Sequence, residues 1–125
     1  EAWHTGNGIG FGSDIEDAKG IDHPPVTAGA FFAAKLGVAE YLLEKKCQAS
    51  ALVLREIRPE YAVPVGVWQI REAIRSAMKN EPYIAENFDD GITFAAKRMS
   101  VSKSEWLSKG DMLSMLKQKS ISDFF

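Results

Sequence analysis

The feature that most restricts the fold is residues 27–46, which have the apolar periodicity of an amphipathic helix. The apolar side chains form one row with a second set beside it, making a wide stripe that we expect to face the core. The row is Phe32, Leu36, Ala39 and Leu43, and the flanking set is Phe31, Val38 and Leu42. Gly29 and Gly37 lower the helix propensity of this run, but they would permit close packing against a sheet.

The sheet is expected from residues 49–57, the best candidate strand. Residues 51–54, Ala-Leu-Val-Leu, are apolar on both faces, as in a strand covered on both sides. A helix from about Trp68 to Asn80 follows, with an apolar stripe of Val67, Ile70, Ile74 and Ala77 or Met78. We therefore predict an α/β fold: a small mixed sheet packed by helices, with a C-terminal helix and a flexible tail.

A chain of 125 residues with 46% hydrophobic content supports one globular core. Residues 1–25 are expected to form a Gly-rich arm at the end of a missing N-terminal domain, residues 26–117 the α/β domain, and residues 118–125 the tail. The alternating glycines of the arm are not a dinucleotide fingerprint, because Ser13 takes the third glycine position and no apolar strand precedes them.

The C-terminal third is expected to be helical. Residues 86–99 fit a helix, although residues 91–94 alone could be a strand, and we favour the helix. Ser102 and Glu105 have the spacing of a capping box, which predicts that a final helix begins there. Its inward-facing residues would be Trp106, Leu107, Leu113 and Leu116.

Composition excludes several classes of function. The net charge of −2 argues against a uniformly basic nucleic-acid coat, although a basic C-terminal third is compatible with DNA or an acidic partner. Cys47 is the only cysteine, so the chain can form no internal disulfide or zinc cluster, and we predict a packing thiol. No apolar run approaches membrane-spanning length and no signal peptide is visible. We expect a cytoplasmic protein with no membrane partner and with no metal or cofactor in this chain.

Charged residues follow the candidate strand and continue onto the next helix. They are Arg55, Glu56, Arg58, Glu60, Arg71, Glu72 and Arg75, and we call them the Arg/Glu belt. The carboxyl end of a buried strand is where open α/β sheets bind ligands. Arg71, Arg75 and Lys79 recur every fourth residue, an arrangement suited to an anion such as a nucleotide phosphate, the DNA backbone or an acidic side chain. A solvated face, or ion pairs with an absent domain, would explain the same residues.

The chain ends in two adjacent phenylalanines, which make a poor core element because chain ends usually fray. In one turn of 3₁₀-like helix Ile121 and Phe124 would eclipse, with Phe125 beside them. This tail resembles the PCNA-interacting peptide (PIP box) of replication and repair proteins. The resemblance implies that Ile121, Phe124 and Phe125 fill the hydrophobic pocket of the clamp and that Gln118 enters the neighbouring polar pocket. The alternative is that both phenylalanines fold back onto their own domain.

The middle of the chain is similar to the C-terminal domain of the archaeal Nre family of DNA repair proteins. The similarity is carried by residues 54–61 and 64–72, and with the first helix and the segment from Trp106 to the tail it extends over roughly residues 25–125. It implies a role in DNA damage repair through the sliding clamp. Family members carry an N-terminal domain with a cysteine zinc motif, which nothing here matches, so zinc would belong to a missing part. The resemblance assigns no catalytic residue.

Two functions remain open at this point. The first is an interaction protein that tethers repair activity to PCNA by its tail. The second is an enzyme acting on a nucleotide or nucleic acid in a cleft lined by the Arg/Glu belt, where glutamate would serve as general base and arginine would hold phosphate. The sequence contains no Ser-His-Asp pattern, metal cluster or P-loop that would sharpen the second.

Overall fold

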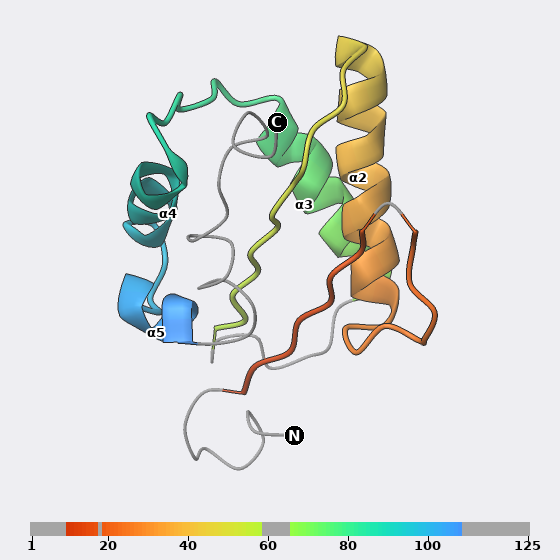
Figure 1. The fold of residues 1–125 in the computed structure, drawn as a ribbon, viewed down its shortest axis with the longest axis horizontal. Coiled ribbons are helices and arrows are strands. Elements are labelled where there is room, and N and C mark those ends of the chain that lie inside the picture. The colour runs from red at the N-terminus through yellow and green to blue at the C-terminus, as the bar shows by residue number, and fades with distance from the viewer. Residues whose placement is uncertain (1–9, 18, 59–65, 109–125) are drawn as a thin grey trace. The chain divides into compact units, whose positions relative to one another are not determined.

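The computed structural model describes residues 10–17, 19–58 and 66–108. Their helices are α2 (Gly29–Lys45), α3 (Val67–Met78), α4 (Phe88–Ala96) and α5 (Lys103–Ser108), drawn in Figure 1. The chain divides into two compact units, Glu1–Pro82 and Tyr83–Phe125. The first unit contains α2 and α3, and the second contains α4 and α5.

The predicted α/β fold with a mixed sheet is wrong. The described residues form helices, and their only β-type pairing is an isolated bridge between Asp17 and Gly20. Residues 49–57, the predicted strand, have no regular secondary structure, and Figure 1 draws them as a long open trace that follows α2. Their apolar side chains suit a strand, but a ladder needs a second strand to exchange hydrogen bonds, and no other described segment supplies one.

Helix α2 packs on α3 through a row of small residues. Gly29, Ala33 and Gly37 are spaced by four and so lie on one face of α2. A Cβ atom added at Gly29 would lie 2.6 Å from Val67 Cγ2, and one added at Gly37 would lie 2.6 Å from Ile74 Cγ2. The glycines therefore allow close packing as expected, but against the branched side chains of a helix and not against a sheet.

The predicted core row of α2 is exposed instead. Phe32, Leu36 and Leu43 have relative exposures of 55%, 42% and 80%. The buried residues of α2 are Ala33, Gly37 and Val38. The prediction is wrong for the row of Phe32, Leu36, Ala39 and Leu43, because the small-residue face permits the closer approach of the two helices and so faces α3 in their place. It is closer for the flanking set, in which Val38 is buried and Phe31 and Leu42 are half-buried.

An acidic side chain ties the segment before α2 to the start of that helix. The carboxylate of Asp14 accepts hydrogen bonds of 2.8 Å from the backbone N–H groups of Val26 and Thr27, and it also accepts one from the Thr27 hydroxyl. The Thr27 hydroxyl is the main reason that the pKa of Asp14 lies below its ordinary value. Lys35 on α2 pairs with Glu16 at 2.8 Å. Residues 14–16 are thus anchored at two points.

The predicted helices of the second unit are confirmed. The side chain of Asn87 caps α4 by accepting a 2.8 Å hydrogen bond from Asp90 N. At the start of α5, Ser102 Oγ accepts a hydrogen bond of 3.3 Å from Glu105 N, as the capping-box spacing predicts. Trp106 is buried, also as predicted, together with Ile92. Leu113 and Leu116 lie outside the described residues.

Candidate functional site

Residues 55–57 and one face of α3 line a small pocket of about 110 Å³ in the first unit. The extended segment contributes Arg55, Glu56 and Ile57, and α3 contributes Gln69, Ile70 and Ala73. The positions 69, 70 and 73 share a helix face because residues four apart are neighbours on a helix. The pocket thus combines an apolar wall with three polar side chains: Arg55, which only donates hydrogen bonds, Glu56, whose carboxylate only accepts them, and Gln69, which does both.

The hydrogen-bond acceptors of this pocket are its most distinctive feature. The Glu56 side chain is only 10% exposed, and its Oε2 accepts a hydrogen bond of 3.2 Å from Arg58 Nε. The Oε1 atom of Gln69 is buried and accepts no hydrogen bond in the described structure. A buried acceptor left unpaired costs about 1–3 kcal/mol. A bound molecule that donates an N–H group would remove that cost.

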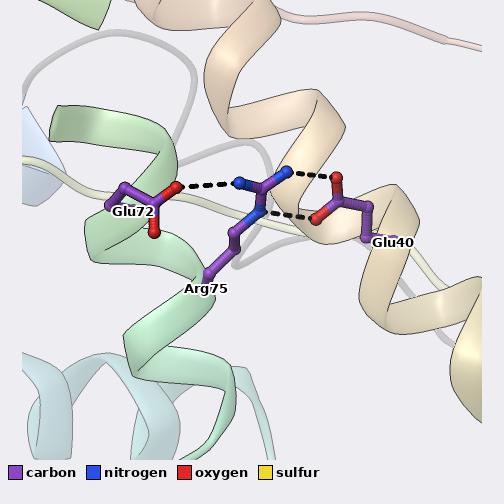
Figure 2. Close-up of polar contacts among 3 residues, drawn as sticks. All are labelled: Glu40, Glu72 and Arg75. Carbon is purple, nitrogen blue, oxygen red and sulfur yellow. Dashed lines mark hydrogen bonds and ion pairs between the residues drawn. The ribbon is translucent and has the colours of Figure 1, made fainter. Parts of the chain in front are cut away.

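Arg75 on α3 pairs with two carboxylates, Glu40 of α2 and Glu72 of its own helix, and the Glu40 pair joins the two helices (Figure 2). Its Nε donates to Glu40 Oε2 at 2.8 Å and its Nη2 donates to Glu40 Oε1 at 2.6 Å, which is a two-pronged pairing. The third nitrogen, Nη1, donates to Glu72 Oε1 at 2.8 Å. These hydrogen bonds raise the pKa of Arg75 and lower the pKa of Glu40. The guanidinium is therefore held between carboxylates of the same chain.

The structure separates the Arg/Glu belt into two groups. Arg55 and Glu56 line the pocket, with Arg58 paired to Glu56. Arg75 forms the α2–α3 ion pair with Glu40 and a second pair with Glu72 within α3. Arg71, one helical turn before Arg75, has a buried Nε without a hydrogen-bond partner in the described structure. Its positive charge further lowers the pKa of Glu40. Glu60 lies outside the described residues.

Sequence reasoning missed two polar residues of these sites. Gln69 was not singled out, and only its neighbourhood with Arg55 and Glu56 in space makes it notable. Glu40 was not singled out either, and it pairs with Arg75, which is 35 residues away in the sequence. No spacing rule connects positions so far apart.

Several expectations concern residues or groups away from the pocket. Gln118, Ile121, Phe124 and Phe125 lie outside the described residues. Cys47 is exposed, so the prediction of a packing thiol is wrong. Among residues 10–17, 19–58 and 66–108, no three potential metal ligands lie together. In the same ranges, no helix has the length and apolar content to cross a membrane.

These features define a small helical module with two helices joined by an arginine fork and one partly polar pocket. The chain belongs to the archaeal Nre family: the model of the Nre C-terminal region matches residues 16–124.

The relatives are longer proteins named for DNA repair. "DNA repair protein NreA" of Archaeoglobus fulgidus is 40% identical over 92% of this chain and 30% of its own length. "DNA repair protein NreA" of Haloferax volcanii is 45% identical over 78% of this chain and 23% of its own length. "DNA repair protein NreB" of Archaeoglobus fulgidus is 28% identical over 98% of this chain and 31% of its own length. The chain thus spans less than a third of each relative. No solved structure matches it.

Proposed function

We propose that this chain acts in DNA repair and docks on the PCNA sliding clamp through its C-terminal PIP motif. The repair role is supported by membership of the Nre family and by relatives named as DNA repair proteins, one of them 45% identical. The docking role is supported by the sequence of the tail, in which Gln118, Ile121, Phe124 and Phe125 have the PIP spacing.

The proposed docking is driven mainly by burial of apolar side chains. Full burial of a large apolar side chain contributes about 1.5–3 kcal/mol. Loss of both Phe124 and Phe125 would therefore remove roughly 3–6 kcal/mol, a loss of about two to four orders of magnitude in affinity. Gln118 would contribute orientation through hydrogen bonds of its amide, with a smaller effect on affinity.

Isothermal titration calorimetry with PCNA tests this proposal. We expect the intact chain to bind with a Kd in the micromolar range or tighter, and Phe124→Ala with Phe125→Ala to abolish binding. Ser122→Ala is the matched control, because Ser122 lies inside the motif but is not one of its four recognition residues; it should bind as the intact chain does. Equal affinity of the double variant would show that the tail does not dock.

We propose nucleotide or nucleic-acid binding at the pocket as a second candidate function. Its specific support is the pair of acceptors, Glu56 and the unpaired Gln69 Oε1, beside the cation of Arg55. Nucleobases with an exocyclic amine donate N–H groups suited to such acceptors. Arg55 could meet a phosphate oxygen, and Ile70 with Ala73 could cover a base face. For a processing enzyme, Glu56 is the pocket's candidate general base.

Thermal unfolding with nucleoside monophosphates tests this second function. A ligand at ten times its Kd adds about 1.4 kcal/mol, or roughly 3–6 °C in Tm for a domain of this size. We expect GMP, AMP or CMP to raise Tm more than UMP, which lacks an exocyclic amine. Gln69→Leu should remove the rise, and Glu44→Gln, on the exposed surface of α2, should preserve it. No shift with any nucleotide, or an equal shift in Gln69→Leu, would exclude nucleotide binding at this pocket.

A further inference from the structure

Helix α2 carries large apolar side chains that the other described residues of its own unit leave exposed. Phe32, Leu36 and Leu43 are 55%, 42% and 80% exposed, and Ala39 in the same row is exposed as well. At about 100° per residue these four positions fall within one strip along the helix. We call this strip the exposed row of α2. It lies roughly a quarter turn around the helix from Gly29, Ala33 and Gly37, which face α3.

The composition of α2 is that of a helix buried on more than one side. A surface helix normally has one apolar stripe and one polar face, whereas a helix that is apolar all round is normally enclosed by other elements. Here the small-residue row contacts α3, Val38 is buried on another side, and the exposed row adds a third apolar strip. Single exposed apolar residues need no explanation, but a contiguous strip marks an interaction surface.

The described residues bury few apolar side chains, which also indicates that α2 has a further contact surface. Among them only Ala33, Val38, Ile92 and Trp106 are buried apolar residues, although 46% of the whole chain is hydrophobic. Full burial of the three large side chains of the exposed row would contribute several kcal/mol, on the scale of the total stability of a small domain.

We propose that the exposed row of α2 is the docking surface for the part of the Nre polypeptide that this chain does not contain. The relatives devote 69–77% of their length to sequence outside the match, so a polypeptide of their length offers a large covalently linked partner. A tethered partner is present at an effective concentration near millimolar, so a small apolar contact is sufficient to hold it. Two separate copies would need about 800 Å² on each partner, which three side chains do not supply.

The partner surface is expected to be apolar at its centre and polar at its edge. The row itself contains no charged residue. Lys35, which neighbours it, is already paired with Glu16 at 2.8 Å. The exposed row therefore offers no row of cations to an acidic or nucleic-acid partner. It does match an apolar surface of the same polypeptide. This inference does not depend on PCNA docking or on nucleotide binding.

Site-specific photo-crosslinking in the full-length polypeptide that carries this region tests the proposal. The crosslinking residue benzoylphenylalanine replaces Leu43 in one sample and Leu36 in another. The matched control replaces Lys45, which lies on the opposite side of α2 and is exposed. We expect crosslinks from positions 43 and 36 to sequence outside residues 1–125, mapped by mass spectrometry, and none from position 45. Crosslinks to a second copy, crosslinks to residues 83–125, or no crosslinks at all would overturn the proposal.

A stability comparison provides a second, independent readout. Leu43→Asp should lower the Tm of the full-length polypeptide by a few degrees more than that of the 125-residue chain. In the 125-residue chain Leu43 is 80% exposed, so the change there costs only helix propensity and the interaction of the new charge with the helix C-terminus. Lys45→Asp is the control and should have the same small effect in both. An equal effect of Leu43→Asp in both proteins, or no effect in either, would contradict a docked row.

Discussion

At the scale of single residues, the contact between Gly37 and Ile74 sets the distance between α2 and α3. An added Cβ at Gly37 would lie 2.6 Å from Ile74 Cγ2 and 3.1 Å from Ile74 Cβ. Isoleucine is branched at Cβ and stiff about χ1, so its side chain cannot turn aside as a long flexible one would. Glycine is thus required at position 37 for its size, even though it weakens a helix.

We predict that Gly37→Ala destabilises the first unit by up to about 2 kcal/mol. Overpacking costs about 1–3 kcal/mol, and the roughly 1 kcal/mol that alanine gains in a helix offsets part of that cost. Gly91→Ala in α4 is the matched control, because its Cβ would meet only Ala85 at an ordinary 3.5 Å. It should stabilise by about 0.5–1 kcal/mol. Urea unfolding measures both. Gly37→Ala should cost less in an Ile74→Ala background than in the unchanged chain, because alanine lacks the Cγ2 atom that the new Cβ would meet. An unchanged or raised midpoint for Gly37→Ala alone would contradict a tight contact.

Arg75 shows that a charged residue's role depends on its partners in space. In the sequence it belongs to a positive row with Arg71 and Lys79 that is suited to an anion. In the structure Glu40 and Glu72 already satisfy its three nitrogens, at 2.6–2.8 Å. An external phosphate at this position would have to displace a carboxylate. The pocket residues Arg55 and Glu56 are therefore the part of the belt better placed to meet a ligand.

At the scale of elements, periodicity identified the helices and failed on the sheet. Helix α3 was predicted within two residues at either end, because its apolar residues recur at helical spacing. Residues 51–54 have equally strong strand character, but a strand depends on a partner elsewhere in the chain, and local sequence contains no information about that partner. The face of α2 that packs could not be predicted either, because apolar size favoured Phe32 and Leu36 while close approach favoured Gly29 and Gly37.

The candidate site was predictable only in part for the same reason. Arg55 and Glu56 were singled out as charged residues after an apolar run, and both line the pocket. Gln69 and Ile70 complete the lining from α3, and only the three-dimensional arrangement brings them there.

The segment before α2 gives a pH-dependent prediction. The Asp14 pKa is lowered by its hydrogen bonds to Thr27 and Val26, so the ionised form stabilises the folded state. This stabilisation is complete above the ordinary carboxyl pKa of about 3.9 and is lost as pH falls further. Asp14→Asn should therefore lower Tm at pH 7, and the difference from the unchanged chain should shrink below about pH 4.

Thermal unfolding between pH 7 and pH 3 measures this effect. Glu81→Gln, at an exposed position, is the control and should show no such pH-dependent difference. A difference between Asp14→Asn and the unchanged chain that is constant across this range would mean that the carboxylate charge plays no part in holding the segment.

At the scale of the whole molecule, the two proposed functions reside in different units. The pocket belongs to the unit Glu1–Pro82, and the proposed PCNA-binding tail belongs to the unit Tyr83–Phe125. Effects of changes at separate sites with no shared partners normally add within a few tenths of a kcal/mol. This separation gives each function its own diagnostic variants.

We predict that the two activities are independent. Phe124→Ala with Phe125→Ala should remove PCNA binding and leave any nucleotide-induced rise in Tm unchanged. Gln69→Leu should do the reverse, with a PCNA affinity within about twofold of the intact chain. Titration calorimetry and thermal unfolding on the same preparations measure both. Loss of PCNA binding in Gln69→Leu would reveal coupling between the units.

The glycine-to-isoleucine contact also constrains how Nre proteins can diverge. The volume available at this point is shared between position 37 on one helix and position 74 on the other. A family member with a larger residue at the first position has to carry a smaller one at the second. The larger residue alone would push the helices apart and misalign Arg75 with Glu40, and the smaller one alone would leave a cavity between them. Substitutions at these two positions are therefore expected to arise in compensating pairs.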